Sequence, residues 1–248
     1  MIKNKHFGKS INNSQILWEK FDPESYVRNN YSYIHPEDRN IIKILIKYYE
    51  NIAQIIASVE IGCGPNIYPL MLALPKVKYI DVIEYSTRNK SYLENNFKNL
   101  EHNWYQFWNL MTDLEFSRKN FKLVENLRKK VKIYKESIYN LPKDKYDLGS
   151  MFFCAESITD VKDEFMLFCQ KFIDCIRSKG YLVAAFMENS EGYSISGINF
   201  PAVSINSFDL KEVFENKIIN QKIYRIPKAK KALRLGYTGI LLLTGNRI

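Results

Sequence analysis

Two glycines and a carboxylate that follows them about 20 residues later are the residues best suited to bind a nucleotide-like ligand. A β-branched run ends just before Gly62 and Gly64, and a pattern that could begin a helix follows at once. Glycines one residue apart allow a tight turn and leave no side chain between the backbone and a ligand. The next helix offers free N–H groups at its positive end. This order predicts a strand, a turn and a helix that together could hold such a ligand.

The segment after this helix strengthens the interpretation. Alone, the glycine pair could be an ordinary turn, because the third glycine of the dinucleotide fingerprint is absent. Residues 78–84, however, read as a second buried strand that ends in Glu84. A Rossmann-type unit places the carboxylate that holds ribose hydroxyls there. Together the two features predict a cofactor site.

Acidic residues also lie at or near the ends of the other predicted strands. In chain order they are Glu60, Glu84, Glu136, Glu156 and Glu188. The carboxyl ends of parallel strands form one rim, and ligands of open α/β sheets bind outside it. Glu156 and Glu188 are our candidates to orient or deprotonate a substrate. Equally, each could be a strand-end carboxylate that bonds a loop or is solvated.

Hydrophobic periodicity and helix-start signals place these residues on alternating strands and helices. The N-terminal helix signal is Asp22 as N-cap with Pro23 at the first helical position. The predicted strands cover 58–62, 78–84, 131–136, 145–154, 181–187, 218–226 and 237–244. The predicted helices begin at Asp22 and His35 and cover 66–74, 86–100, 113–130, 160–178 and 207–216, and residues 189–204 read as a loop.

Five β-α alternations followed by a hairpin-like pair predict an α/β fold with a doubly wound, Rossmann-like sheet of seven strands. We expect residues 1–50 to form a helical lid and residues 51–248 to form the core of the same structural domain. A hairpin after the fifth strand is typical of class I methyltransferases rather than dehydrogenases.

The composition is that of a soluble globular protein, with 248 residues, 46% of them hydrophobic, and a net charge of +9. The basic surplus gathers in residues 128–132 and 228–234. Such runs could meet RNA, phosphorylated substrates or an acidic carrier protein, or could be solvated helix ends and loops. The Asn-Pro-Pro-Tyr and Asp-Pro-Pro-Tyr signatures of nucleobase methylation are absent from the sequence, which makes a nucleic-acid partner less plausible.

Metal binding and membrane insertion find no support in the sequence. The four cysteines show no C-x-x-C spacing, and the three histidines lie far apart, so we predict no metal site. No apolar run approaches the roughly 18 residues of a membrane span, and no signal-peptide core follows the first residues. We expect a cytoplasmic protein without a membrane partner.

Three blocks of the sequence resemble the nicotinamide/phenylethanolamine/thioether N-methyltransferase family. They are Phe21-Asp22-Pro23-Glu24-Ser25-Tyr26 with Tyr31, Glu60-Ile61-Gly62-Cys63-Gly64-Pro65-Asn66-Ile67-Tyr68, and Glu84-Tyr85-Ser86 with Asn89. The glycine block is the most specific, and the likeness covers roughly residues 18–190.

The resemblance implies S-adenosylmethionine as cofactor and assigns roles to the matching residues. Tyr26, Tyr31 and Tyr68 would enclose the methionine end, while Gly62 and Gly64 let the cofactor reach the main chain. Glu84 would take the ribose hydroxyls in place of the family's usual Asp. Other members of the implied cofactor site are Glu60, Tyr85, Asn89 near the ribose, and Glu136 with Ser137 beside the adenine.

One position departs from the family pattern. Animal members place an acidic residue after the fifth strand, where this chain has Phe186, with Glu188 two residues later. From the resemblance as a whole we expect a methyltransferase that acts on a small molecule, at nitrogen, by in-line transfer. The alternatives are a methyltransferase for RNA or a carrier-bound substrate, and a protein that binds the cofactor or its product without turnover.

Overall fold

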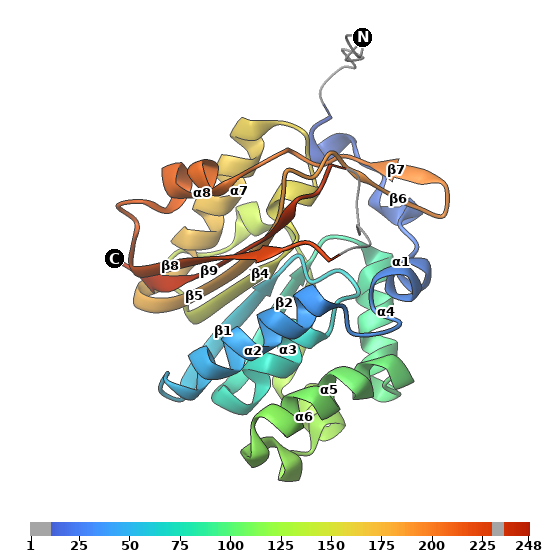
Figure 1. Cartoon of the computed structure of the whole chain (residues 1–248), viewed down its shortest axis with the longest axis vertical. Coiled ribbons are helices and arrows are strands. Elements are labelled where there is room, and N and C mark those ends of the chain that lie inside the picture. The colour runs from blue at the N-terminus through green and yellow to red at the C-terminus, as the bar shows by residue number, and fades with distance from the viewer. Residues whose placement is uncertain (1–10, 230–235) are drawn as a thin grey trace.

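Seven strands form one mixed sheet between two layers of helices in the computed structural model, which describes residues 11–229 and 236–248 (Figure 1). The sheet order is β3-β2-β1-β4-β5-β9-β8. Strands β1 to β5 run parallel, while β9 pairs antiparallel with both β5 and β8. The strands are β1 (Ile55–Ile61), β2 (Val77–Glu84), β3 (Val131–Lys135), β4 (Tyr146–Phe152), β5 (Ile176–Glu188), β8 (Ile218–Pro227) and β9 (Gly239–Arg247). The predicted doubly wound, Rossmann-like sheet of seven strands is confirmed.

The helices divide between the two faces of the sheet. The core on one face takes side chains from α2 to α6, and the core on the other takes them from α7 and α8. The helices are α1 (Pro23–Asn30), α2 (Pro36–Glu50), α3 (Tyr68–Ala73), α4 (Thr87–Lys98), α5 (His102–Leu114), α6 (Leu123–Lys130), α7 (Lys162–Asp174) and α8 (Ser207–Phe214). The strand order reverses between β1 and β4, and this opens a crevice at their carboxyl ends.

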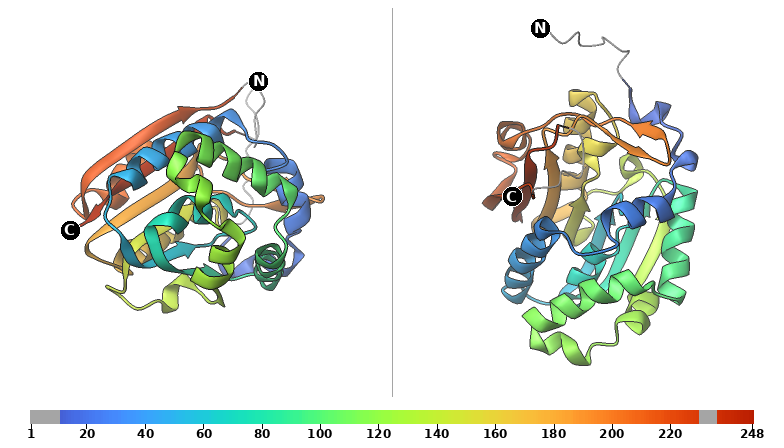
Figure 2. Two further views of the ribbon diagram at one scale, coloured as in Figure 1. Left: turned by 90° about the horizontal axis from the view of Figure 1, so that it is seen from below. Right: turned by 45° about the vertical axis from the view of Figure 1, so that its right-hand side comes forward.

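A short hairpin occupies part of the segment that the sequence suggested was a loop. Strands β6 (Tyr193–Ile195) and β7 (Ile198–Phe200) form it, and Ser196 and Gly197 both have positive φ at its turn. The hairpin lies against the N-terminal segment (Figure 2). The prediction of a loop over 189–204 missed this pairing because its strands are only three residues long.

Two helix boundaries also differ from the prediction. A single charged helix over 113–130 is wrong, since α5 ends at Leu114 and α6 begins at Leu123. Arg118 lies between them, almost fully buried, and donates to the carbonyls of Met71 and Leu72 at the end of α3. This contact favours a break in the helix.

The helix predicted over 160–178 ends earlier, at Asp174, because the chain enters β5 at Ile176. Ile176 pairs with Tyr146 of β4, and a register shift follows before Leu148 pairs with Tyr181. Lys179, with φ of 65°, lies within this irregular part of the strand. Pairing with the interior strand β4 therefore set the end of this helix earlier than helical periodicity had suggested.

No helix among the described residues is both long and apolar enough to cross a membrane. The first ten residues, including His6, and most of the second basic run, Lys230 to Arg234, lie outside the described residues.

Candidate functional site

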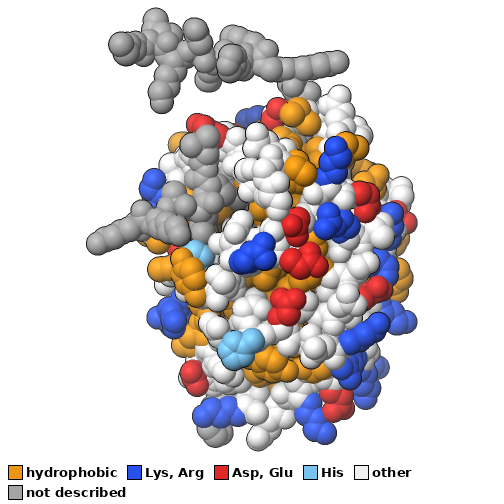
Figure 3. All heavy atoms as spheres, turned by 90° about the vertical axis from the view of Figure 1, so that its right-hand side faces the viewer, with side chains coloured by type: hydrophobic (Ala, Val, Ile, Leu, Met, Phe, Trp, Pro, Cys, Tyr) orange, Lys and Arg blue, Asp and Glu red, His pale blue; other side chains and the backbone are white. Residues whose placement is uncertain are grey.

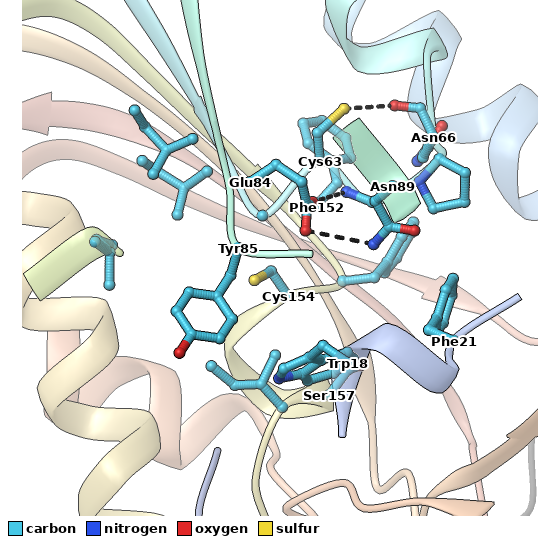
Figure 4. Close-up of a pocket in the computed structure, with 18 of the residues that line it drawn as sticks. Trp18, Phe21, Cys63, Asn66, Glu84, Tyr85, Asn89, Phe152, Cys154 and Ser157 are labelled. Carbon is cyan, nitrogen blue, oxygen red and sulfur yellow. Dashed lines mark hydrogen bonds between the residues drawn. The ribbon is translucent and has the colours of Figure 1, made fainter. Parts of the chain in front are cut away.

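A pocket opens at the carboxyl ends of β1, β2 and β4 and has a volume of about 820 Å³, including its part open to solvent (Figure 4). Its floor is the turn after β1, and its sides come from the loops after β2, β3 and β4. Trp18, Phe21, Tyr26 and Tyr193 contribute aromatic walls from the N-terminal segment and the hairpin. The pocket thus lies at the point that the strand order predicts for a ligand.

The two glycines of the turn are required for different reasons. Both have positive φ, 59° at Gly62 and 55° at Gly64, a conformation that favours glycine. A Cβ on Gly62 would lie 2.1 Å from the Cys154 sulfur, whereas a Cβ on Gly64 would meet nothing within 4 Å. Gly62 therefore allows close packing of β1 on the β4 loop, and Gly64 leaves open space for a ligand.

Glu84 is fixed at the end of β2 by the turn that it faces. The Gly64 N–H donates to Oε2 at 2.8 Å, and the Ser86 N–H donates to Oε1 at 2.8 Å. Asn89 Nδ2 also donates to Oε1, at 3.4 Å (Figure 4). Burial raises the pKa of Glu84, and these hydrogen bonds oppose the rise. Oε2, which accepts one of these hydrogen bonds, keeps a further lone pair with which it could accept a hydrogen bond from a hydroxyl.

Glu136 and Ser137 line the pocket after β3. The Ser137 N–H and Asn140 Nδ2 each donate to Glu136 Oε1 at 2.7 Å. The hydrogen bond from Ser137, followed by that from Asn140, lowers the pKa of Glu136. These two hydrogen bonds therefore fix the Glu136 carboxylate at the mouth of the pocket.

The three predicted tyrosines come together, but only two of them line the pocket. Tyr26 and Tyr31 do so, with ring centroids 5.9 Å apart. Tyr68 is fully buried behind them, 6.0 Å from Tyr31, and stacks on Phe107 at 5.4 Å. Burial and the nearby Asp38 carboxylate raise the pKa of Tyr68. This phenol therefore stays neutral.

Two further members of the predicted cofactor site have contrasting environments. Glu60 is fully buried, receives a hydrogen bond from Ser150 Oγ and does not line the pocket. Burial raises its pKa to about 8. Tyr85 lines the pocket and is 57% exposed as a residue, so it belongs to the outer rim.

The two predicted catalytic carboxylates do not line this pocket. Glu156 is fully buried after β4 and accepts from the Met187 N–H at 3.0 Å. Glu188 binds Arg225 through both its oxygens, with a shortest distance of 2.7 Å, and accepts from Thr238 Oγ1. The Arg225 hydrogen bond lowers the pKa of Glu188. Both therefore hold loops and strands together, and their action on a substrate stays a prediction.

Phe186 lies on the opposite face of the sheet from the aromatic walls. It is fully buried between Phe165 of α7 and Phe214 of α8, at centroid distances of 6.0 and 6.2 Å. Its side chain is therefore part of the core and does not line the pocket.

Several lining residues were not singled out by the sequence. Cys154 and Ser157 come from the β4 loop, and Tyr193 comes from the hairpin. Phe153 has a φ of 54°, a strained conformation that only the structure reveals. The remaining lining residues not predicted as site members are Asn13, Trp18, Phe21, Ile61, Cys63, Pro65, Asn66, Ile83, Ile138, Phe152, Ile158 and Phe168. Of these, Phe21, Ile61, Cys63, Pro65 and Asn66 lie within the family blocks, which was the available signal.

The walls away from Glu84 and Glu136 are neutral. Among the described residues, these two carboxylates are the charged side chains that line the pocket. Burial raises the pKa of the Cys154 thiol well above its usual range, so it is protonated and a poor nucleophile. The arrangement suits a reaction between two bound molecules, in which the protein fixes their relative position and offers an aromatic surface.

The lining residues fit a nucleoside joined to an amino acid. Asn66 Nδ2 and Asn89 Oδ1 are buried and lack a hydrogen-bond partner in the described part of the chain. Buried polar atoms of this kind usually have a partner, which a ligand with both donors and acceptors would supply. The open space at Gly64 and the held Glu84 carboxylate fit a ribose. The residues are thus compatible with S-adenosylmethionine.

Comparison with protein families gives one match over most of the chain. The model described as the NNMT/PNMT/TEMT family matches residues 10–247. A search of curated protein sequences finds no significant match.

Solved structures with the same fold include several methyltransferases of low sequence identity. The N-methyltransferase NodS from Bradyrhizobium japonicum WM9, in complex with S-adenosyl-L-homocysteine, has a TM-score of 0.59 and 11% identity, with 92% of this chain and 93% of that chain covered. Magnesium protoporphyrin IX methyltransferase from Synechocystis PCC 6803, with S-adenosylmethionine, has a TM-score of 0.61 and 10% identity, with 96% and 99% covered. The 1,6-didemethyltoxoflavin-N1-methyltransferase of Burkholderia thailandensis has a TM-score of 0.56 and 9% identity, with 95% and 86% covered.

Proposed function

Because the chain belongs to the NNMT/PNMT/TEMT family and is an S-adenosylmethionine-dependent methyltransferase, we propose that it methylates a small molecule at nitrogen. The observation that supports a small-molecule acceptor is the set of aromatic side chains that wall and roof the pocket. Its roof is formed by Trp18 and Phe21, which pack on Phe200 of the hairpin with ring centroids 5.7 and 5.4 Å apart. A compact acceptor fits beneath such a roof more readily than a polymer.

We assign the cofactor to the pocket by the chemistry of its walls. Glu84 and Asn89 would hold the ribose, and Glu136 with Ser137 would flank the adenine. Tyr26 and Tyr31 would enclose the amino-acid end, with Tyr68 behind them. Glu60 and Tyr85 would support the site from below and from the rim. When bound, the cofactor would supply a methyl group on a positively charged sulfur.

The protein itself would align the two molecules and stabilise the charge that develops during transfer. Methyl transfer is an in-line displacement, so aligning the two molecules and excluding water provides much of the acceleration. A nitrogen that gains a methyl group gains positive charge, and the faces of Tyr26, Tyr193 and neighbouring rings can stabilise a cation. The N-methyltransferases among the similar folds support nitrogen as the target. Glu156 and Glu188 would act by fixing the loops after β4 and β5 around the acceptor.

A carrier-bound substrate or RNA is the second candidate acceptor, suggested by the basic runs. Two cations of the first run have structural partners, however. Arg128 Nε donates to the Phe97 carbonyl at 2.8 Å, and Lys130 Nζ donates to the carbonyls of Leu74 and Val77. These contacts favour a structural role for this run and support the small-molecule proposal.

Calorimetric titration with S-adenosylmethionine and with S-adenosylhomocysteine tests the cofactor assignment. We expect micromolar binding of both to the natural protein, and at least about a tenfold loss in Glu84→Gln, since a hydrogen bond to a charged group is lost. Glu94→Gln, on the exposed side of α4, is the matched control. The absence of binding to either compound would overturn the assignment.

A second experiment identifies the acceptor. The protein and S-adenosylmethionine are incubated with separate panels of amines, nitrogen heterocycles, thiols, phenols and RNA, and the products are analysed by mass spectrometry. A methylated amine or heterocycle is the expected result. Methylated RNA alone would reverse the order of the two candidates, and tight cofactor binding without any product across the panels would indicate a binding protein.

A further inference from the structure

A second cavity lies beside the cofactor pocket, between α1 and the β6–β7 hairpin. Its volume is about 1090 Å³, including its part open to solvent. Figure 1 shows α1 and the hairpin on the same side of the molecule. Tyr26 and Tyr193 line both cavities, and their ring centroids are 6.5 Å apart. A molecule that occupied both cavities would therefore pass these two rings.

Hydrogen bonds hold the two sides of the second cavity in place. Asp22, the N-cap of α1, accepts a hydrogen bond from Ser196 Oγ at the turn of the hairpin, at 2.9 Å. At the other end of α1, Asn30 Nδ2 donates to the Tyr26 carbonyl at 2.8 Å. The helix and the hairpin are thus tied to each other, which keeps the space between them open.

The lining of this cavity is mainly polar and aromatic. Three of its residues carry a side-chain amide, one a hydroxyl, one a carboxylate and three an aromatic ring. They are Asn29, Asn30, Asn199, Ser194, Glu191, Tyr26, Tyr193 and Phe200. Amides and hydroxyls can both donate and accept hydrogen bonds. Glu191 is the one charged residue in the described part of this lining, so the cavity suits a neutral or cationic ligand better than an anionic one.

A saccharide has the chemistry that matches this lining. Its hydroxyls donate and accept, as amides and carboxylates require of a partner, and the C–H faces of its ring can pack on aromatic side chains. An apolar ring of the same size would displace water from the amides without replacing the lost hydrogen bonds, which costs free energy. A phosphorylated ligand would meet Glu191 and no lysine or arginine among the described lining residues.

We infer that this cavity binds the saccharide part of the methyl acceptor, so that the acceptor is an amino sugar or an amine joined to a sugar. This inference rests on the proposed methylation at nitrogen. The saccharide lies between α1 and the hairpin, and the nitrogen extends past Tyr26 and Tyr193 towards the cofactor pocket. The two tyrosines then contact both molecules.

Methyl-resolved NMR of protein labelled at the isoleucine Cδ1 atoms locates the ligand without any activity measurement. Ile195 lines the second cavity, while Ile61 and Ile83 line the cofactor pocket. N-acetylglucosamine should shift the Ile195 resonance, with saturation on the order of 1 mM, and leave Ile61 and Ile83 unchanged. N-cyclohexylacetamide is the matched control, because it keeps the ring and the acetamide but lacks the hydroxyls. It should bind at least about tenfold more weakly.

The other NMR outcomes contradict the inference. An unchanged Ile195 resonance, or equal shifts with the two compounds, would show that the cavity does not recognise a saccharide. Shifts at Ile61 and Ile83 in place of Ile195 would put the saccharide in the cofactor pocket. S-adenosylhomocysteine should itself shift Ile61 and Ile83. Failure of that shift would reject the cofactor assignment, while the saccharide result at Ile195 could still be read.

Methyl transfer to a panel of amino sugars, with cyclohexylamine as the amine without hydroxyls, tests the link to the acceptor. Mass spectrometry should detect a methylated amino sugar. Asn29→Ala, at the exposed end of α1, should lower kcat/KM for this amino sugar by about threefold to tenfold through one lost hydrogen bond, and leave cyclohexylamine within about twofold. Asn95→Ala, at an exposed position of α4, is the control.

Two results of this experiment would overturn the inference. One is the absence of any methylated amino sugar from the panel. The other is an equal effect of Asn29→Ala on the amino sugar and on cyclohexylamine. If cyclohexylamine alone were methylated, the proposed methylation at nitrogen would stand and the saccharide part of the acceptor would be rejected.

Discussion

Glu60 is a carboxyl group whose environment changes its ordinary chemistry. It is fully buried two residues before Gly62, and burial raises its pKa from 4.5 to about 8, with Ser150 Oγ opposing the rise. In the unfolded chain this carboxyl ionises near its ordinary pKa. The folded protein therefore holds a proton that the unfolded chain releases between these two values.

This proton makes stability depend on pH. For each proton that the folded protein holds and the unfolded chain has released, the free energy of unfolding falls by about 1.4 kcal/mol per pH unit as the pH rises. The contribution of Glu60 is complete below pH 4.5 and is lost as the pH rises to about 8. In Glu60→Gln this slope should disappear, so the natural protein should lose stability relative to the variant between pH 5 and 8.

Urea denaturation at several pH values measures the effect. The comparison with Glu60→Gln is needed because burial also raises the pKa of Asp38, to about 7, which adds a slope of the same sign to both proteins. Glu125→Gln, at an exposed position of α6, is the matched control. Parallel stability curves for the natural protein and Glu60→Gln would contradict the prediction.

At the scale of elements, Asp22 joins helix α1 to the hairpin. It caps the helix by accepting from the Ser25 N–H at 3.1 Å and from Ser25 Oγ at 2.7 Å. It also accepts from Ser196 Oγ at the turn of the hairpin, at 2.9 Å. Because α1 carries Tyr26, this one carboxylate positions two walls of the pocket.

We expect Asp22→Ala to lower the free energy of unfolding by about 1 kcal/mol, the usual cost of losing an N-cap. Asp22→Asn keeps a capping oxygen and should cost less. Ser196→Ala removes only the contact with the hairpin and separates the two roles. Urea denaturation of the three variants measures these differences, and an unchanged stability in Asp22→Ala would show that the cap contributes nothing.

At the scale of the molecule, charged side chains are distributed over the surface. The pocket, by contrast, is built from segments far apart in the sequence. The net charge is +9, yet Figure 3 shows basic and acidic side chains interspersed on the face it draws. The pocket, in contrast, is lined by residues from 13 to 193. A ligand there would contact the N-terminal segment, the sheet loops and the hairpin at once.

Binding should therefore stabilise the whole fold. At a free concentration 100 times its dissociation constant, S-adenosylhomocysteine should add about 2.7 kcal/mol and raise Tm by roughly 5–10 °C for a chain of this size. Differential scanning fluorimetry measures this shift. In Glu84→Gln at the same ligand concentration the shift should shrink, and an equal shift in both proteins would argue against Glu84 as a ligand contact.

The succession of strands and helices along the chain and part of the pocket lining could be predicted because they depend on local pattern. Buried runs, helix caps and turn glycines repeat along the chain at readable spacings, and Asp22 caps α1 as predicted. The pocket brings together Tyr26, Tyr31, Gly62, Gly64 and Glu84, from three separate blocks. Boundaries failed where a distant contact outweighed the local pattern, as at Arg118 and at the pairing of Ile176 with Tyr146.

The sequence by itself determined the fold class and the edge of the sheet at which the pocket lies, because the succession of strands and helices and the turn chemistry follow from local pattern. Only the tertiary structure decided which strand-end carboxylates face the pocket. Glu84 lines it, whereas Glu60 is buried beneath it and Glu188 is bound by Arg225 from β8. The physical reason is that a carboxylate's role depends on its partners and its burial, and these come from segments far away in the chain.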